Sequence, residues 1–516
     1  MKEFNITGTC IPHLHYMVDT GKKIGEITEL IKKGKYFTIN RPRQFGKTTT
    51  LYLLEKALEN DYLLISTSFE GIGDSSFQDE NTLSKVFISL IKESLEIINE
   101  QVLIESIKKA PQPETLLELG NFISDLVKKS EKKIVLLIDE VDKAGNYRLF
   151  LNFLGILRNK YLKRDTGKDF TFHSVILAGV HDIKNIKLKL RPEDEKQFNS
   201  PWNIATEFDV DLSFHPEEIA TMLMDYEKDL QTGMDIPLMS NEIYKFTNGY
   251  PFLASKICKV IDEKLNKNWT TEGIQDAVTE IIETQSTIVD DLIKNIENNN
   301  DLESFVKRLL IENDKISYVH SDKIISYGTM FGIFKSDKNK LVQIHNKIFE
   351  IVLYNHIIAK LDRENSKVTG NVFQPNFLDK NGDLEMEKVL LKFQQFVKET
   401  YSNKDEVFYE RQGRLLLIAF VKPIINGTGF YYVESQHSYE KRSDMIIAFN
   451  KKEYILELKI WRGREYHTEG LEQLASYLNS KGHNLGYLVV FNFNKNKEFT
   501  NEWNDVDGKK IFQVMV

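Results

Sequence analysis

The stretch KYFTINRPRQFGKTTTLYLLEKAL, residues 35–58, decides the fold of the N-terminal half of the chain. It reads as a short apolar strand, a polar loop and an amphipathic helix. The loop ends in Gly46-Lys47-Thr48, where the helix is expected to begin. Backbone N–H groups at a helix N-terminus attract anions, so this loop can cradle phosphate groups. The pattern predicts an α/β fold.

The loop resembles the Walker A motif, G-x-x-x-x-G-K-[ST], with Arg41 at the first glycine position. The resemblance implies that Lys47 contacts the terminal phosphates of ATP and that Thr48 holds Mg²⁺. An R-P-R-x-F-G-K-[ST] loop is also similar to that of one group of AAA-like ATPases. The nucleotide-binding residues expected from the loop are Arg43, Gln44, Phe45, Gly46, Lys47, Thr48 and Thr49.

Residues 132–144, KKIVLLIDEVDKA, predict a continuous apolar strand that ends in Asp139-Glu140. Such strands are typical of parallel sheets that are covered on both faces. The pattern resembles a Walker B motif. The resemblance implies that Asp139 positions Mg²⁺ and that Glu140 polarises the water that attacks the γ-phosphate. Together the two motifs predict a site that binds and hydrolyses ATP with Mg²⁺ as cofactor.

A further strand is expected in FHSVILAGVHD, residues 172–182. In ATPases of this type the end of that strand carries a residue that senses the γ-phosphate. The local candidates are His181 and Asp182, and an ordinary loop is the favoured interpretation. Arg191 could act as an arginine finger, but a solvated surface arginine is favoured over that role.

Two later stretches resemble the lid region of the STAND class of signalling NTPases. Residues 200–205 read SPWNIA, and residues 248–253 read NGYPFL before an apolar helix. The resemblance implies a helical lid in which Pro251 lies near the adenine nucleotide. After the lid, helices around 302–312 and strands at 331–334 and 341–344 look like a winged helix. We expect it to serve internal packing rather than DNA binding, because it has no obviously basic recognition helix.

Near the C-terminus, the runs SDMIIAF (443–449) and EYILELKIW (453–461) alternate in the strand manner and predict a hairpin. Because side chains alternate between faces, Glu457 and Lys459 project from one face, which Asp444 on the partner strand can reach. Two neighbouring carboxylates repel unless a divalent cation lies between them. Mg²⁺ suits this role because it keeps waters, one of which can attack a phosphodiester. We expect Asp444 and Glu457 to bind the metal and Lys459 to orient that water.

This arrangement resembles the PD-(D/E)xK nuclease superfamily in its ExK form. The resemblance implies strands flanked by helices and a further acidic residue upstream, for which Glu434 is preferred over Glu410. It also implies that Gln473 and Tyr477, one helical turn apart, belong to the helix that follows the lysine. The expected catalytic residues of this domain are Glu434, Asp444, Glu457, Lys459 and Gln473. A surface hairpin with an ordinary Glu/Lys pair is the competing interpretation.

The composition is that of an ordinary globular protein. Of 516 residues, 41% are hydrophobic and 28% charged, and the net charge is −8. Acidity over the whole chain does not indicate polyanion binding, so any contact with DNA must come from local patches. The only cysteines, Cys10 and Cys258, show no pairing pattern, which favours a reducing cytoplasm. No apolar run approaches the length of a membrane span, and no secretory signal is recognisable.

Together these patterns predict a multidomain α/β protein. The expected parts are an AAA-like ATPase core at 1–210, a helical lid at 211–295, a winged-helix module at 296–360, a linker at 361–383 and a nuclease-like domain at 384–516. The leading hypothesis is an ATPase that gates a Mg²⁺-dependent DNA nuclease, in prokaryotic defence or mobile-element biology. The alternative is a STAND-like signalling ATPase whose C-terminal domain only binds nucleic acid or protein. A DNA motor ranks last, and homo-oligomer formation is left open.

Overall fold

The computed structural model describes residues 2–516 except 145–147, 181–201, 203, 285, 311–313, 365–376, 401–409, 426–428, 433–444, 462 and 493–497. The chain divides into two compact units. The first comprises Met1–Tyr244, Gly249–Lys259 and Met330–Gly332, and the second comprises Lys245–Asn248, Val260–Thr329 and Ile333–Val516.

A four-stranded parallel sheet forms the centre of the first unit, in the order β1-β4-β3-β2. Its strands are β1 (Tyr36–Asn40), β2 (Leu63–Ser68), β3 (Ile134–Asp139) and β4 (Ser174–Gly179). Every residue of β3 and β4 is buried, as their continuous apolar sequences predict. Beyond β1, Thr206 makes a parallel bridge with Phe37. The expected parallel sheet is therefore confirmed.

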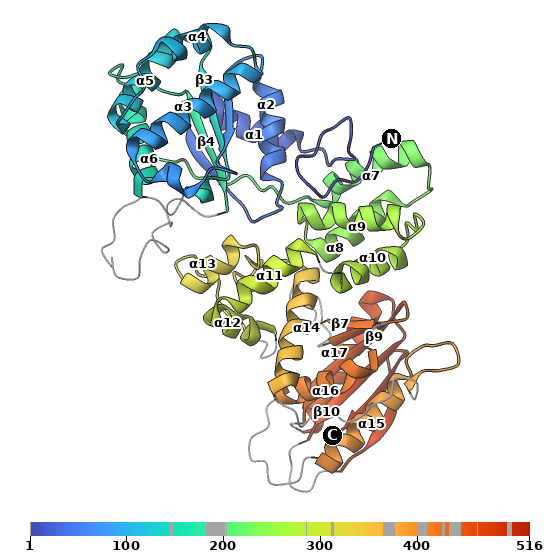
Figure 1. Ribbon diagram of the computed structural model, residues 1–516. Helices are drawn as coiled ribbons and strands as arrows, with labels where there is room; N and C mark the ends of the chain where they lie inside the picture. The colour runs from blue at the N-terminus through green and yellow to red at the C-terminus, as the bar shows by residue number, and fades with distance from the viewer. Residues whose placement is uncertain are drawn as a thin grey trace. The chain divides into compact units, whose positions relative to one another are not determined.

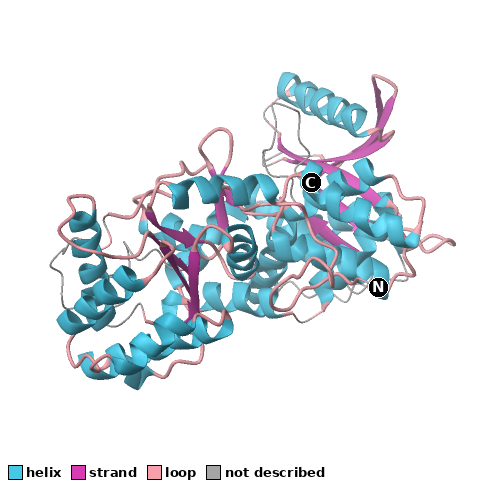
Figure 2. Cartoon of the chain, turned by 90° about the horizontal axis from the view of Figure 1, so that it is seen from above, coloured by secondary structure: helices cyan, strands magenta, loops and turns pink. Residues whose placement is uncertain are grey.

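Helices cover both faces of this sheet (Figures 1 and 2). They are α1 (Gly21–Lys32), α2 (Lys47–Leu58), α3 (Glu80–Ile97), α4 (Gln101–Lys109), α5 (Leu116–Lys129) and α6 (Arg148–Arg164), with short 3₁₀ turns at η1 (Asp74–Phe77) and η2 (Val141–Lys143). Side-chain caps begin two of them: Asp79 accepts from the backbone N–H of Thr82, and Thr115 accepts from that of Glu118. One apolar core joins α3, α4, α5 and α6 to the strands.

The segment expected to form a lid, residues 211–295, consists mainly of helices. It contains α7 (Pro216–Leu230), α8 (Ile236–Thr247) and α9 (Pro251–Glu263). Pro216 opens α7, and the backbone N–H of His215 donates to Glu218 Oε2 at 2.8 Å. The turn before α9 requires glycine, because a Cβ on Gly249 would lie 2.2 Å from the carbonyl oxygen of Phe214. This close approach fixes where α9 begins.

The second unit starts with a helical part that ends in a small hairpin and a long helix. Its elements are α10 (Thr271–Glu283), α11 (Thr287–Glu297), α12 (Asn300–Leu310), α13 (Lys323–Met330), β5 (Phe334–Ser336), β6 (Val342–Ile344) and α14 (Lys347–Glu364). The first wing strand was expected at 331–334, but it begins at Phe334. The Phe334 ring fixes this register by packing on Gly328, where a Cβ would lie 2.2 Å from it.

A six-stranded mixed sheet follows, in the order β11-β12-β10-β9-β8-β7. Its strands are β7 (Gly429–Tyr432), β8 (Met445–Phe449), β9 (Lys452–Ile460), β10 (Leu485–Phe491), β11 (Asn501–Val506) and β12 (Lys509–Met515). The expected hairpin is confirmed: β8 and β9 are antiparallel, with Met445 opposite Leu456. Its turn uses the left-handed conformation at Asn450 and Lys451, with φ of 47° and 64°.

The helices α15 (Met386–Thr400), α16 (Glu410–Ile425) and α17 (Arg464–Lys481) pack on the two faces of this sheet, and Tyr354 of α14 packs against Tyr431 of β7. Leu474 and Leu478 of α17 share a core with Leu488 and Val490 of β10. On the other face, Phe491 meets Phe393 of α15 and lies so close to Gly413 of α16 that a Cβ there would be 2.6 Å away. The mixed α/β architecture is compatible with the C-terminal domain expected from the sequence. None of the helices described is long and apolar enough to cross a membrane.

Candidate functional site

The phosphate-binding loop connects β1 to α2 and closes around a lysine. Gly46 precedes α2 in the left-handed conformation with φ of 80°. Lys47 is 7% exposed, and its Nζ donates to the carbonyl oxygens of Arg41 at 3.1 Å and Pro42 at 3.0 Å. Burial lowers the pKa of Lys47, while the carboxylates of Glu140 and Asp142 oppose this effect. The loop therefore holds the lysine that begins the N-terminal turn of α2, a position that suits the binding of phosphate groups.

The carboxyl end of β3 lies beside this loop. Thr48 Oγ1 donates to Asp139 Oδ2 at 2.7 Å, and the backbone N–H of Glu140 donates to Asp139 Oδ1 at 2.9 Å. Asp139 is only 7% exposed, so both of its carboxylate oxygens are held in place. The structure thus brings together the residues expected to bind Mg²⁺ in this unit. A hydroxyl and a carboxylate are hard oxygen donors, as this cation requires.

Glu140 adopts a left-handed backbone conformation, with φ of 53° and ψ of 39°. Such a conformation is uncommon for a residue other than glycine and persists only where the surroundings impose it. Burial raises the pKa of Glu140, and the neighbouring Asp139 carboxylate raises it further. A carboxylate made more basic in this way is better suited to accept a proton from water.

The residue before α9 contacts the loop through an aromatic side chain that the sequence patterns did not identify. Tyr250 Oη donates to the carbonyl oxygen of Arg43 at 2.6 Å, and its ring packs edge-on against Phe45 with centroids 4.9 Å apart. Pro251, the residue expected near the adenine, opens α9 immediately after Tyr250. In the sequence, the position of this tyrosine directly before Pro251 could have indicated its contact with the loop.

Two further segments of the first unit reach the loop. The backbone N–H of Cys10 donates to Thr49 Oγ1 at 3.1 Å. Gly332, with φ of 71°, lies against the loop so closely that an added Cβ would be 2.8 Å from Pro42 Cγ and 3.4 Å from the Tyr250 ring. Parts of the chain from before β1 and from after α13 therefore surround the loop.

In the second unit, the strand β9 brings Glu457 and Lys459 together. Lys459 Nζ lies 2.8 Å from Glu457 Oε1, and the Glu457 side chain is 5% exposed. Gly470 of α17 leaves room for the lysine stem, because an added Cβ would be 3.3 Å from Lys459 Cγ. Gln473, expected to assist this site, is exposed on α17, whereas Tyr477 is buried.

Several expected site residues lie outside the described part of the chain: Glu434, Asp444, His181, Asp182 and Arg191. The alternative acidic candidate, Glu410, opens the helix α16. Among the described residues, no group of three or more His, Cys, Asp or Glu side chains could hold a metal ion. Of the residues expected at the C-terminal site, Glu457, Lys459 and Gln473 are described, and Glu457 and Lys459 form an ion pair.

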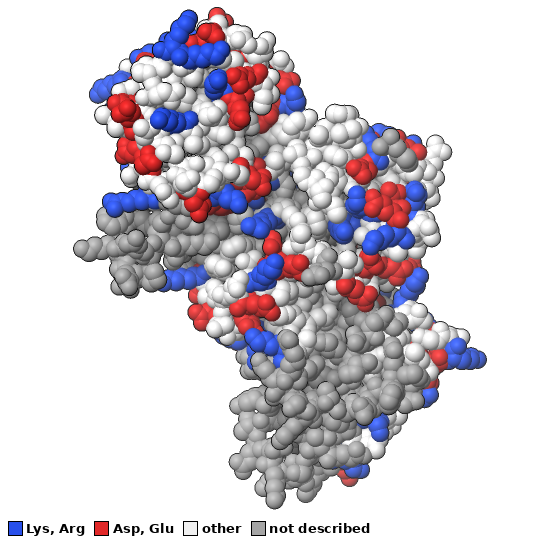
Figure 3. Space-filling view, viewed as in Figure 1, with Lys and Arg blue, Asp and Glu red and all other residues white. Residues whose placement is uncertain are grey.

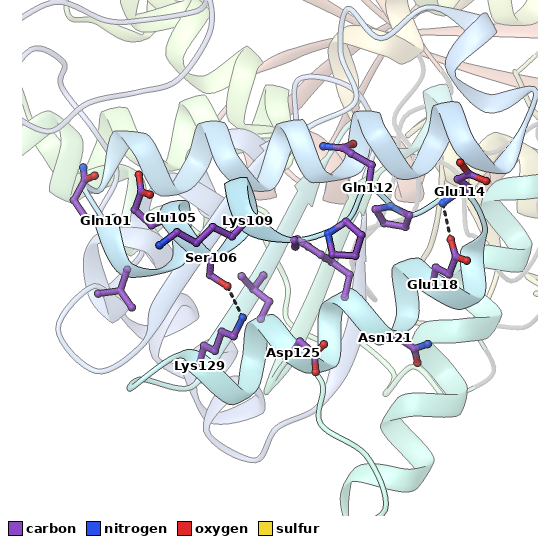
Figure 4. Close-up of a pocket in the computed structure, with 16 residues that line it drawn as sticks. Gln101, Glu105, Ser106, Lys109, Gln112, Glu114, Glu118, Asn121, Asp125 and Lys129 are labelled. Atoms are coloured by element: carbon purple, nitrogen blue, oxygen red, sulfur yellow. Dashed lines mark hydrogen bonds between the residues drawn. The ribbon is translucent and has the colours of Figure 1, made fainter.

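A groove of about 1190 Å³ lies on another part of the first unit, between α4 and α5 (Figure 4). Lys129 of α5 donates to Ser106 of α4 at 2.7 Å and joins its two walls. None of the residues expected to bind nucleotide or metal lines it. On the surface shown in Figure 3, acidic and basic side chains are interspersed over the residues drawn in colour, in keeping with the chain's modest net charge.

One curated relative matches part of the chain. It is the "Uncharacterized WD repeat-containing protein slr0143" of Synechocystis sp. (strain ATCC 27184 / PCC 6803 / Kazusa), which is 22% identical over 267 residues. The match covers 50% of this chain and 21% of the relative, so the chain spans about a fifth of that protein's length.

Solved structures resemble the chain over about two thirds of its length. The Walker-type ATPase paby2304 of Pyrococcus abyssi is 12% identical with a TM-score of 0.46, over 68% of this chain and 99% of that chain. The ORC2 protein of Aeropyrum pernix, in its ADPNP-ADP complexes, is 13% identical with a TM-score of 0.34, over 69% and 98%. The RuvB Holliday junction branch migration motor of Thermotoga maritima is 12% identical with a TM-score of 0.33, over 66% and 95%.

The family described as "AAA-like domain" matches residues 16–351. The matched span is more than half of the 516 residues and contains the phosphate-binding loop, β3 and the lid helices. The chain therefore belongs to the AAA-like domain family and carries a P-loop ATPase domain.

Proposed function

We propose that the first unit binds ATP with Mg²⁺ and hydrolyses it. The hydrogen bond of 2.7 Å between Thr48 and Asp139 carries this proposal, because it places the two expected magnesium ligands together beside Lys47. Mg²⁺ supplies charge neutralisation and orientation of the phosphates. Lys47 and the backbone of the loop would bind the phosphates, and Thr48 and Asp139 would hold the metal.

Glu140 completes the proposed site as the residue that orients the attacking water. Its raised pKa is consistent with a group that accepts the proton of that water. Tyr250 would keep the loop in the binding conformation through Arg43 and Phe45. The remaining loop residues, Gln44, Gly46 and Thr49, would contribute backbone and side-chain contacts to the nucleotide.

The test is release of phosphate from ATP by the full chain, with and without Mg²⁺, together with calorimetric binding of ATP. We expect Mg²⁺-dependent turnover in the native chain and retained binding without turnover in Glu140→Gln. Binding without turnover in the native chain would reduce the proposal to nucleotide binding. No binding at all would refute it.

We further propose a Mg²⁺-dependent DNA nuclease in the C-terminal domain, gated by the ATPase. Glu457 and Lys459 lie together on β9, 2.8 Å apart, and support this proposal because a carboxylate and a lysine are two of the groups that metal-dependent cleavage of a phosphodiester requires. Asp444 immediately precedes Met445, whose partner Leu456 immediately precedes Glu457. This register supports Asp444 as the second metal ligand, with Glu434 as the upstream acid. A place in prokaryotic defence or mobile-element biology is part of the same proposal.

The alternative is a STAND-like signalling ATPase whose C-terminal domain only binds nucleic acid or protein. The Glu457–Lys459 ion pair supports this alternative too, since it satisfies both charges without a metal. Plasmid and linear DNA incubated with Mg²⁺ or Mn²⁺, with and without ATP, separate the two. Metal-dependent cleavage supports the nuclease, ATP dependence of that cleavage supports gating, and binding without cleavage supports the alternative.

A further inference from the structure

A single peptide group at the end of β4 joins the phosphate-binding loop to the turn after β3. This peptide links Gly179 to Val180. Its carbonyl oxygen accepts a hydrogen bond of 3.1 Å from the backbone N–H of Arg41, the first residue of the loop. Its N–H donates a hydrogen bond of 2.5 Å to Asp142 Oδ2. The two ends of the nucleotide site are thus connected through one rigid planar unit.

The fit of Asp142 against β4 is tight. A Cβ added to Gly179 would lie 3.0 Å from both carboxylate oxygens of Asp142 and 3.0 Å from Val141 Cγ2. Val141 and Ala144, on either side of Asp142, are fully buried. The short helix η2 therefore has little freedom to move, and glycine at 179 leaves the space that the carboxylate occupies.

Asp142 lies two residues after Glu140, whose left-handed backbone needs an external restraint. The backbone N–H of Lys143 also donates to the carbonyl oxygen of Glu140, at 3.1 Å, which closes the turn between them. Asp139 restrains the start of the turn by accepting from the N–H of Glu140. Asp142 restrains its other end by binding β4. Glu140 is thus held between two anchored carboxylates.

We propose that Asp142 is a positioning residue for ATP hydrolysis. By holding the Gly179–Val180 peptide it fixes the turn that carries Glu140 relative to the phosphate-binding loop, so the Glu140 carboxylate stays at the place where water is activated. The inference rests on the proposed hydrolysis of ATP. It assigns to Asp142 an effect on the rate of turnover and none on the affinity for nucleotide.

Asp142→Ala and Asp142→Asn in the full chain test this role. Asp142→Ala should lower kcat by about tenfold or more and leave the Kd for ATP within about twofold. Asp142→Asn keeps an oxygen that can accept from the Val180 N–H, so it should recover most of the rate. Asp125→Ala, which removes an exposed aspartate of α5, is the matched control and should change neither constant.

Gly179→Ala tests the same contact without removing Asp142, because the added Cβ would push the Asp142 carboxylate away from the Val180 N–H. It should lower kcat as Asp142→Ala does and leave the Kd for ATP within about twofold. If Asp142→Ala does not fold, kcat and Kd of Gly179→Ala test the positioning role instead. Full kcat in the folded variants, or equal losses of kcat and ATP affinity, would overturn the positioning role. Absence of turnover in the native chain would instead remove the proposed hydrolysis of ATP, on which this role rests, so the two failures are distinguishable.

Discussion

Thr48 and Asp139 are joined by a hydrogen bond of 2.7 Å although they lie 91 residues apart in the chain. The sheet explains this contact. β1 and β3 flank β4 and run parallel, so the loop that follows β1 and the last residue of β3 meet at the same edge. Ligands of open α/β sheets bind at such carboxyl edges.

Removing the Thr48 hydroxyl should weaken the use of Mg²⁺. In Thr48→Ala, Asp139 keeps its buried position but loses a donor and a fellow magnesium ligand. We expect kcat/KM for Mg²⁺-ATP to fall by about tenfold or more, equivalent to about 1.4 kcal/mol. Phosphate release measured over a range of Mg²⁺ concentrations checks this. The control is Thr28→Ala, which removes a hydroxyl that donates to Ile24 within α1 and should leave kcat and KM unchanged. An unchanged kcat/KM in Thr48→Ala would contradict the assignment of Thr48 as a magnesium ligand.

Tyr250→Phe should separate the hydrogen bond of Tyr250 from its aromatic packing. Phenylalanine keeps the ring against Phe45 but leaves the Arg43 carbonyl without the hydroxyl donor. We expect ATP affinity to fall by about fivefold, in line with about 1 kcal/mol for one hydrogen bond. Tyr250→Ala should have a larger effect because it removes the packing too. Calorimetric titration with ATP measures both, and Tyr62→Phe, a half-buried tyrosine that stacks on His173, serves as control.

The contribution of the Glu457–Lys459 pair to DNA cleavage can be measured separately from its contribution to the stability of the fold. Glu457→Ala leaves a lysine without its carboxylate and should lower the unfolding free energy by about 3 kcal/mol. The double variant Glu457→Gln with Lys459→Met removes both charges and should be much more stable than the single one. Under the nuclease proposal the double variant cleaves no DNA yet hydrolyses ATP at the native rate. Cleavage that survives in this folded variant would exclude the pair from catalysis.

The hairpin of β5 and β6 should make stability depend on pH. Burial lowers the pKa of Lys335 to about 8, although the Glu350 carboxylate acts in the opposite direction. In the unfolded chain a lysine titrates near about 10.4, so between these values the unfolded state binds more protons than the folded state. The unfolding free energy then rises with pH through this window, and below it the cost of burying the charge is complete.

We therefore expect the native chain to gain about 1 kcal/mol relative to Lys335→Met between pH about 7.5 and about 9.5. Urea unfolding at the two pH values, followed in the native chain and in the variant, measures the difference. Lys338→Met, which replaces an exposed lysine of the same hairpin, is the control and should behave like the native chain. A native chain that loses stability relative to Lys335→Met over this pH range would contradict the lowered pKa of Lys335.

The parts of the fold that could be predicted are those encoded locally. The strand-loop-helix around Lys47 and the alternation in β8 and β9 depend on neighbours in sequence, and both were found where expected. The wing strand began three residues later than expected because Phe334 packs on Gly328, a tertiary contact. Tyr250 and Asp142 escaped prediction for the same reason. The roles proposed for them rest on contacts with Arg43 and Val180, which no spacing in the sequence indicates.

The close approach of Gly332 to Pro42 has a consequence for biosynthesis. On the ribosome, β1 and the phosphate-binding loop emerge early, long before the turn after α13 exists. The loop cannot reach its final surroundings until that turn has been translated, so this contact is among the long-range ones that form late in folding. A nascent chain that stops within α12 would contain every Walker residue and still present Pro42 without the glycine that packs on it.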